Sequence, residues 1–209
     1  MLLEPTRLAS YISSKICHDL VSPLGAGGSA LDFLGDDSAP ELREQAEQLL
    51  ISGTQRGLAR LQFLRYAFGS MGLSNGFADV HEAKTIVEGY VDTHTGHVEW
   101  DIQAEGVTFS QIRVLMNLVM LGLACLPRNG KMVIEIRQNE KIDIRLRASG
   151  QRSRLAADVK AALDRTEPED GWNPRTIQPY YTTLIVDEAG ATLTNEIVGD
   201  EIIFDVKGL

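Results

Sequence analysis

Two long segments near the start of the chain contain apolar residues that recur every three or four positions. This spacing places the apolar residues on one face of an α-helix, so it predicts a helix over residues 6–34 and a second over residues 40–68. The apolar positions are Leu8, Ile12, Ile16, Leu20, Leu24, Leu31 and Leu34 in the first segment, and Leu42, Ala46, Leu49, Gly53, Leu61, Leu64 and Phe68 in the second.

The turn between these segments, residues 35–40, reads Gly-Asp-Asp-Ser-Ala-Pro. Asp37 or Ser38 is expected to cap the second helix, with Pro40 in its first turn. Two helices joined by so short a turn form an antiparallel hairpin. Since a hairpin alone buries only one side of each helix, we expect two copies to pair as a homodimer with a four-helix bundle.

A glycine-rich stretch, residues 69–76, follows the second helix and marks the expected domain boundary. We therefore divide the chain into a helical-hairpin domain, residues 1–72, and a second domain, residues 77–209. The second domain alternates between helical and strand patterns, which predicts an α/β (α+β) fold with helices on one face of a sheet. The expected helices cover residues 79–90, 110–126, 152–164 and 176–189, and the expected strands cover residues 98–102, 132–137, 142–147, 192–198 and 201–206.

The charge and the cysteines restrict the partners and the location. The 209 residues include 20 Lys and Arg against 29 Asp and Glu, a net charge of −9. A surface this acidic repels nucleic acid and anionic membranes, so we expect neither as a partner.

The longest apolar run, residues 114–126, is shorter than the roughly 20 residues that a membrane span needs. Cys17 and Cys125 lack C-x-x-C spacing and no signal peptide is seen, which favours a cytoplasmic location.

His18 is the most conspicuous residue of the first helix, because it lies opposite the apolar stripe. With Leu8 at zero, the stripe falls between about 40° and 160°, and His18 falls near 280°. Its neighbours on that face are the small residues Ser14, Ser22, Gly25 and Ser29. Pro23 removes the hydrogen bond that the Asp19 carbonyl would accept, which favours a kink beside His18. Small neighbours would let another protein approach His18 closely, which favours a functional histidine. The alternative interpretation is an ordinary surface histidine without a function.

Residues 17–26 read Cys-His-Asp-Leu-Val-Ser-Pro-Leu-Gly-Ala. This run resembles the H-box of two-component sensor histidine kinases, whose pattern is His-acidic-Leu-x-x-Pro-Leu. The resemblance implies that His18 is the phospho-accepting nucleophile on the first helix of a dimeric four-helix bundle. It also implies that the second domain is a histidine-kinase-ATPase-like α/β sandwich.

The ATP-binding motifs of that kinase family are missing from the second domain. The helix around Asn117 resembles the kinase N-box, but Leu121 and Ala124 stand where the kinase has its Mg²⁺-holding asparagine and a lysine. Leucine cannot ligate a hard cation, which needs oxygen. Residues 148–152 replace the kinase Asp-x-Gly-x-Gly motif, and residues 178–183 lack the glycines of the phosphate-binding loop. We therefore expect no ATP binding and no intrinsic cofactor.

An H-box hairpin followed by a degenerate kinase-like domain is similar to the ChpT-type histidine phosphotransferases of alphaproteobacterial phosphorelays. The resemblance covers nearly the whole chain. It implies that His18 takes a phosphoryl group from the aspartate of a hybrid-kinase receiver domain and passes it to the aspartate of a response regulator. Since we find no metal-ligand cluster near His18, the receiver is expected to supply Mg²⁺ and a lysine.

Several residues around His18 have candidate roles within this interpretation. Asp19 orients the imidazole or tunes its basicity. Ser22 and Lys15, one turn to either side of His18, contact the phosphoryl group or are ordinary surface residues. The candidate docking residues are Ser14, Gly25 and Ser29, with Arg60 and Arg65 as rim charges or as solvated side chains.

Two alternative functions remain open, whereas two local motifs that could suggest a ligand site are rejected. The chain could be an ATP-dependent autokinase with divergent motifs, or a docking protein that inhibits a kinase without carrying phosphate. Residues 25–30 match G-x-G-x-x-[GA], but they follow a helix rather than the strand that a dinucleotide site requires. His94 and His97, with His81 nearby, lack a cysteine ligand and are read as surface histidines rather than a zinc site.

Overall fold

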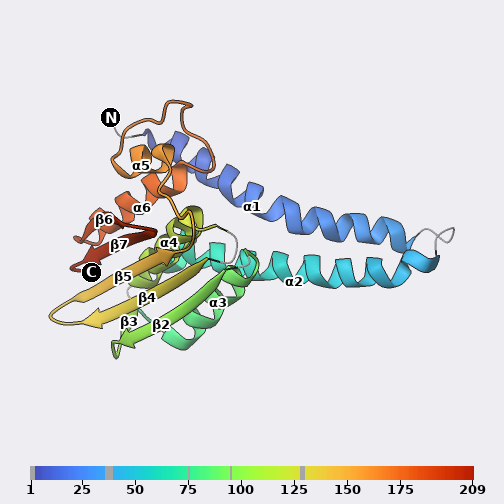
Figure 1. Ribbon diagram of the computed structural model, residues 1–209, viewed down its shortest axis with the longest axis horizontal. Coiled ribbons are helices and arrows are strands. Elements are labelled where there is room, and N and C mark those ends of the chain that lie inside the picture. The colour runs from blue at the N-terminus through green and yellow to red at the C-terminus, as the bar shows by residue number, and fades with distance from the viewer. Residues whose placement is uncertain (1–2, 36–39, 75, 95, 128–129) are drawn as a thin grey trace.

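The computed structural model describes residues 3–35, 40–74, 76–94, 96–127 and 130–209. Two long helices, α1 (Pro5–Leu34) and α2 (Arg43–Phe68), form an antiparallel hairpin that projects from a compact body (Figure 1). A 3-10 turn, η1 (Pro40–Leu42), leads into α2. Both predicted helices are confirmed. The predicted caps of the second helix, Asp37 and Ser38, lie outside the described residues.

Small residues make the contact between α1 and α2. A Cβ at Gly53 would lie 3.0 Å from the Pro23 carbonyl oxygen and 3.1 Å from the Gly27 nitrogen, so the two backbones are in contact there. By contrast, Leu24 and Leu31 of the sequence stripe are 60% and 58% exposed. We call the contact between α1 and α2 the seam, which the apolar stripe therefore does not form. The buried residues of the seam are Pro23, Gly27 and Ala30 of α1 and Ala46, Gly53 and Gly57 of α2.

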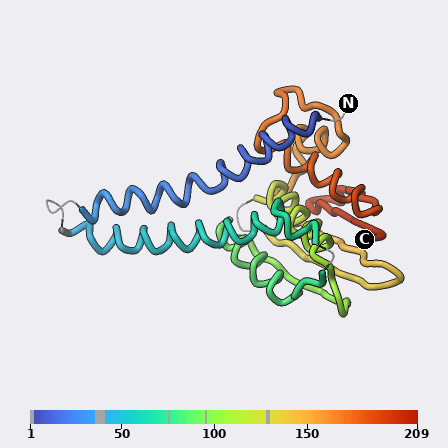
Figure 2. Tube along the Cα trace, turned by 180° about the vertical axis from the view of Figure 1, so that it is seen from behind, coloured from blue at the N-terminus to red at the C-terminus, as the bar shows by residue number. Residues whose placement is uncertain are grey.

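The hairpin opens toward the body. The two helices run side by side at their far end and separate as they approach the rest of the chain (Figure 2). Near the body α2 buries larger side chains, Phe63, Leu64 and Tyr66, in place of glycines. This widening leaves room for a cleft beneath the middle of α1.

The body is built on a five-stranded sheet. The strand order is β2 (His97–Gln103), β4 (Lys131–Gln138), β5 (Ile142–Ser149), β7 (Glu201–Lys207) and β6 (Thr192–Val198). Strands β2 and β4 are parallel, and the other neighbours are antiparallel. Both predicted strand hairpins, β4–β5 and β6–β7, are confirmed. The buried residues of β4, β5 and β7 alternate along each strand and so face one side of the sheet, as period-2 patterning requires.

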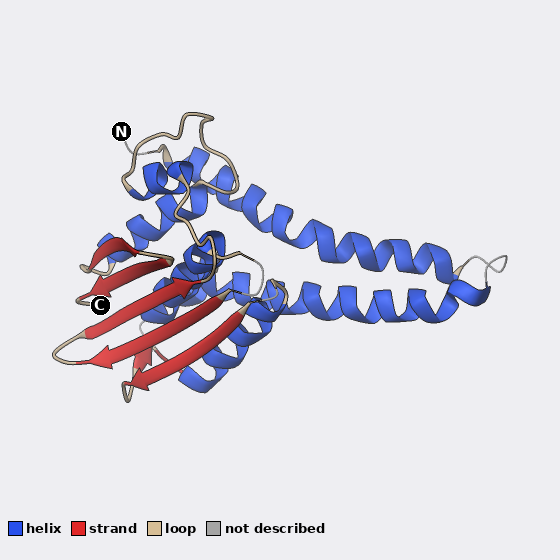
Figure 3. Ribbon diagram, in the orientation of Figure 1, coloured by secondary structure: helices blue, strands red, loops and turns tan. Residues whose placement is uncertain are grey.

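Three helices cover that apolar side of the sheet (Figure 3). They are α3 (Val80–Asp92), α4 (Phe109–Cys125) and α6 (Ile177–Glu188). Helix α4 begins with a capping box between Thr108 and Gln111 and is buried along most of its length. The predicted α/β layer, with helices on one face of the sheet, is confirmed.

Some local elements differ from the sequence prediction. The expected helix over residues 152–164 is shorter, because α5 spans only Ala157–Leu163. Arg152 has a φ of 74°, a left-handed conformation that ends regular structure there. The short paired strands β1 (Phe77–Ala78) and β3 (Val107–Thr108) were not predicted, since two residues carry no periodicity.

The hydrophobic core runs across the predicted domain boundary. Phe63, Leu64 and Ala67 of α2 belong to the same buried cluster as the inner faces of α4 and the sheet. Helix α1 is also attached to the body, because its Tyr11 and Ile12 pack against a second buried cluster from α5 and α6. The body therefore holds both helices of the hairpin.

Within the described part of the chain, none of the helices has the length and apolar character needed to cross a membrane.

Candidate functional site

His18 lies in the middle of α1 and its side chain is 73% exposed. Its exposure agrees with its predicted position opposite the apolar stripe. The Nδ1 atom lies 3.2 Å from Oδ1 of Asp19. An ionised carboxylate can only accept a hydrogen bond, so in the neutral imidazole this contact places the proton on Nδ1 and leaves the lone pair on Nε2. The nitrogen with nucleophilic character is thus the one that faces away from Asp19.

Asp19 is buried between α1 and the body and is held by Lys15 as well as by His18. Lys15 Nζ lies 2.9 Å from Oδ1 and 2.7 Å from Oδ2 of Asp19. A buried carboxylate needs such a partner because desolvation of an unpaired charge is costly. Sequence reasoning treated Lys15 as a phosphoryl contact or a solvated residue. The structure instead places most of the Lys15 side chain out of solvent and its ammonium on Asp19.

Arg60 is neither a charge at an open rim nor a solvated side chain, the two alternatives that the sequence left open. The side chain is half-buried between α1 and the end of α3. Its Nη1 donates to the Asp19 carbonyl oxygen at 2.9 Å, and its Nε donates to the Thr93 hydroxyl at 3.3 Å. Both interactions are internal. The guanidinium therefore joins the hairpin to the body rather than projecting toward solvent.

The exposed face around His18 is made of small residues, as predicted. Ser14, Ser22, Gly25 and Ser29 are all exposed, and a Cβ added at Gly25 would meet nothing within 4 Å. Arg65, further along α2, is also exposed. The structure thus brings Ser14, Ser22, Gly25 and Ser29 onto one accessible surface with His18.

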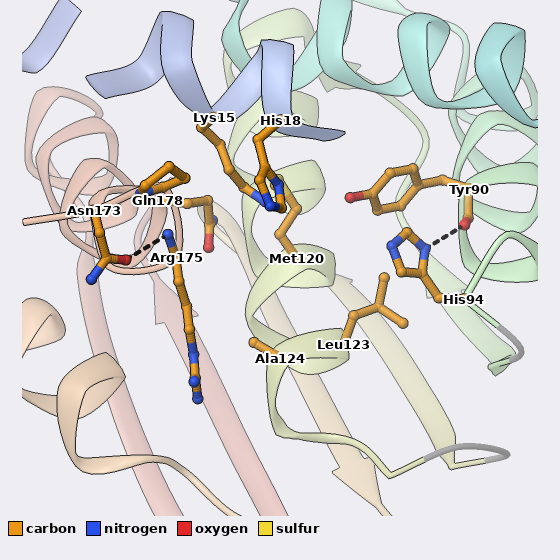
Figure 4. A pocket seen from close by; sticks show the side chains of 11 residues that line it. Lys15, His18, Tyr90, His94, Met120, Leu123, Ala124, Asn173, Arg175 and Gln178 are labelled. Atoms are coloured by element: carbon orange, nitrogen blue, oxygen red, sulfur yellow. Dashed lines mark hydrogen bonds between the residues drawn. The ribbon is translucent and has the colours of Figure 1, made fainter. Parts of the chain in front are cut away.

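A cleft of about 480 Å³ separates the His18 side of α1 from the body (Figure 4). Lys15 and His18 point into it from α1, and Met120 and Ala124 of α4 lie opposite them. The remaining lining residues are Tyr90, His94, Leu123, Asn173, Pro174, Arg175 and Gln178. Sequence reasoning missed this cleft, because its walls come from segments that share no motif and meet only in the folded chain.

Tyr90 and His94 form one wall of the cleft. The Tyr90 ring stacks on Phe63 at 3.7 Å between centroids, and burial raises the pKa of Tyr90. The Nδ1 atom of His94 lies 3.0 Å from the Tyr90 carbonyl oxygen, and partial burial lowers the pKa of His94. His94 is nevertheless exposed, as expected of a surface histidine, and its ring also lines the cleft. The described residues contain no group of three or more His, Cys, Asp or Glu side chains placed to hold a metal ion.

Several of the residues that replace the kinase motifs lie in the interior, whereas Ala124 and Arg152 are exposed. Leu121 and Ala148 are fully buried in the hydrophobic core. Asn117 is also buried, and its Nδ2 donates to the Ala67 carbonyl oxygen at 3.0 Å, while its Oδ1 accepts from Gln178 Nε2 at 3.1 Å. These amides satisfy each other and the backbone, so they connect α4 to α2 and α6.

Comparison with known proteins agrees with this architecture. Residues 80–201 match the family model of the histidine phosphotransferase C-terminal domain. The chain is 27% identical to the protein phosphotransferase ChpT of Brucella abortus (strain 2308) over 207 residues, which cover 98% of this chain and 97% of that protein. A solved bacterial phosphotransferase superposes with a TM-score of 0.88 at 24% identity, over 99% of this chain and 98% of the other.

The family match covers more than half of the chain, and the fold likeness covers nearly all of it, including both the hairpin and the body. The chain therefore belongs to the histidine phosphotransferase family, whose members are phosphotransferases of phosphorelays.

Proposed function

We propose that His18 carries the phosphoryl group, taking it from the phospho-aspartate of a hybrid-kinase receiver domain and delivering it to response-regulator aspartates. The observation that carries this proposal is the geometry at His18. Its side chain is exposed, its Nδ1 is engaged by Asp19, and its Nε2 is free for attack. A nucleophile on a rigid helix gains from this pre-set orientation.

The transfer step conserves atoms and charge. The Nε2 lone pair attacks phosphorus, the bond from phosphorus to the aspartyl oxygen breaks, and its electron pair returns to the receiver carboxylate. The phosphorylated imidazole keeps its Nδ1 proton and gains positive character, which the Asp19 carboxylate stabilises across the 3.2 Å contact. The reverse sequence at a second receiver completes the relay.

The Mg²⁺ and lysine for this step are proposed to come from the receiver. Asp19 is the carboxylate that contacts His18. Its Oδ1 is engaged by Lys15 and the imidazole, and the Lys15 ammonium also lies 2.7 Å from Oδ2. One engaged carboxylate is a poor site for Mg²⁺, which prefers several free oxygen ligands. The body is proposed to bind no ATP, since Leu121 and Ala148 supply no oxygen or acceptor where the kinase motifs do.

The receiver is proposed to dock across the small-residue face of α1. Ser14, Gly25 and Ser29 allow close approach on either side of His18, and Ser22 lies close enough in the helix to touch the phosphoryl group. Arg65 is the exposed cation proposed for the rim of this surface. We further propose that the protein works in the cytoplasm, consistent with the unpaired Cys17 and Cys125, with no nucleic acid or membrane partner.

A labelled transfer assay tests this function. The protein is incubated first with γ-labelled ATP and Mg²⁺, then with each member of a panel of purified, phosphorylated receiver domains. We expect no label from ATP and an acid-labile, base-stable label from at least one receiver. The label should be absent in His18→Gln and present in His81→Gln, a control at an exposed histidine of the body.

The two alternative functions give different results in the same assay. Label from ATP alone would indicate an autokinase. A receiver that binds the protein and is never dephosphorylated by it would indicate a docking protein, as would unchanged relay flux in His18→Gln.

A further inference from the structure

One helical hydrogen bond is missing from α1, and the carbonyl that lacks its donor belongs to Asp19, the residue after His18. Pro23 has no backbone N–H, so the Asp19 carbonyl lacks the donor that an α-helix normally supplies four residues later. Pro23 is buried against α2, where its carbonyl oxygen lies beside Gly53. The Asp19 carbonyl is therefore an acceptor next to the nucleophile that the helix itself cannot satisfy.

Arg60 provides the missing donor from the second helix. Its Nη1 lies 2.9 Å from the Asp19 carbonyl oxygen, the same oxygen that Pro23 leaves without a partner. Its Nε reaches the Thr93 hydroxyl at 3.3 Å, and that hydroxyl donates to the Tyr90 carbonyl at 2.8 Å. One guanidinium thus joins α1, α2 and the end of α3, since its planar fork points two donors in fixed directions.

This connection acts on the site through Asp19. The carbonyl of Asp19 is held by Arg60, and its carboxylate is held by Lys15 and touches His18 Nδ1. Fixing the backbone of Asp19 fixes the direction in which its carboxylate meets the imidazole. Loss of the Arg60 contact would leave a half-buried carbonyl unsatisfied, and the helix around His18 would be free to adopt other local geometries.

We propose that Arg60 is a positioning residue for phosphotransfer, which replaces the helical hydrogen bond lost at Pro23 and so holds Asp19 and His18 in the orientation that frees Nε2. This inference rests on the proposed relay through His18. It assigns Arg60 a task inside the protein, in place of a contact with the receiver.

Single-turnover kinetics separate these two roles. The phosphorylated receiver that labels the wild-type protein is varied in concentration, and the maximum rate and half-saturating concentration are measured. Arg60→Ala should lower the maximum rate about tenfold and leave the half-saturating concentration unchanged. Arg56→Ala, one turn earlier on the same helix and exposed, should change neither. A raised half-saturating concentration with an unchanged maximum rate would show that Arg60 is a docking charge and overturn the proposal.

A double-mutant cycle tests the link to Pro23. Pro23→Ala restores the N–H, so the Asp19 carbonyl regains its helical partner and no longer depends on Arg60. The rate loss caused by Arg60→Ala should then largely disappear in the Pro23→Ala background. Equal losses in both backgrounds would contradict the proposal, because independent sites give additive effects.

A spectroscopic measurement keeps the inference testable without any receiver. The ¹⁵N shifts of the His18 imidazole report which nitrogen carries the proton. The wild-type protein and Arg56→Ala should show the Nδ1–H tautomer, and Arg60→Ala should show a mixture of tautomers. An unchanged tautomer in folded Arg60→Ala would overturn the proposal. If no receiver labels the wild-type protein, the relay function fails, and this measurement still decides the role of Arg60.

Discussion

His18 and His94 line the same cleft but have different surroundings. His18 is largely open to solvent, whereas the His94 ring lies against Tyr90 and its Nδ1 is turned to the backbone. Burial is the main cause that lowers the pKa of His94, and Arg60 and Lys15 act in the same direction. The hydrogen bond to Tyr90 and the charge of Asp19 oppose it. The balance lowers the pKa of His94 and so favours its neutral form.

This environment predicts a dependence of stability on pH. The unfolded chain protonates His94 near its ordinary pKa of about 6.5, whereas the folded protein protonates it only at lower pH. The unfolded state thus binds more protons in this interval, so the free energy of unfolding should fall as the pH drops below about 6.5 and level off below the folded pKa. Urea unfolding between pH 7.5 and 5 measures this fall.

The matched variants are His94→Gln and His81→Gln. The first should flatten the pH dependence, and the second, at an exposed position, should retain it. Equal slopes in the two variants would contradict the assignment to His94.

Sequence reasoning reached some residues of the site and missed others for a physical reason. His18, Asp19 and the small exposed neighbours follow from helical geometry within one segment. The role of Arg60 depends on a partner 41 residues away in sequence, which periodicity does not report. Lys15 is paired with Asp19 four residues along the same helix, a spacing that helical periodicity does report, but the burial of the pair comes from the folded chain. Pro23 was the available signal, because a proline inside a helix predicts an unsatisfied carbonyl that some other donor must reach.

At the scale of elements, the contact between α1 and α2 depends on glycine. Gly53→Ala would gain helix propensity, but its Cβ would press on the Pro23 carbonyl and the Gly27 nitrogen, which are backbone atoms and cannot rotate away. We expect a net loss of stability of about 1–3 kcal/mol. Gly25→Ala meets nothing within 4 Å and should gain up to about 1 kcal/mol from propensity alone.

Thermal or urea unfolding of the two variants measures this contrast. If Gly53→Ala is as stable as Gly25→Ala, the two helices can move apart at little cost, and the expected loss of stability is contradicted.

The elements themselves were predictable where their pattern was long. Both hairpin helices, α4 and the paired strands of the sheet follow from their periods of 3.6 and 2. The seam of the hairpin was not predictable in this way, because apolar patterning marks large side chains and the seam uses the smallest ones. Helix α5 was overestimated because the polar residues before it form a turn with a left-handed Arg152.

At the scale of the whole molecule, the hairpin carries an unpaired apolar face. The chain alone leaves Leu24, Leu31, Ile51, Leu58 and Leu61 half or more exposed. Leu24 and Leu31 are seven residues apart, as are Ile51 and Leu58, which is the repeat of a helical bundle. Leu24 also lies against Gly57, so the faces of α1 and α2 are continuous. We propose that a second copy of the chain covers this surface.

Light scattering coupled to gel filtration tests this pairing. The wild-type protein should have the mass of a dimer, and Leu24→Glu combined with Leu58→Glu should yield a monomer. Ile197→Glu, at a similarly exposed residue on β6, should remain a dimer. A monomeric wild-type protein would contradict the proposal.

The attachment of the body to both helices has a consequence for the direction of phosphoryl flow. Packing at Ile12 on α1 and at Phe63 and Leu64 on α2 fixes the body at two separate points, so rotation about a single pivot is not available. In the proposed relay the donor and the acceptor would therefore encounter the same cleft geometry. In the proposed relay the protein is regenerated after each round of transfer, so it adds no bias of its own, and the net flux would follow the relative phosphorylation potentials and concentrations of the two receivers.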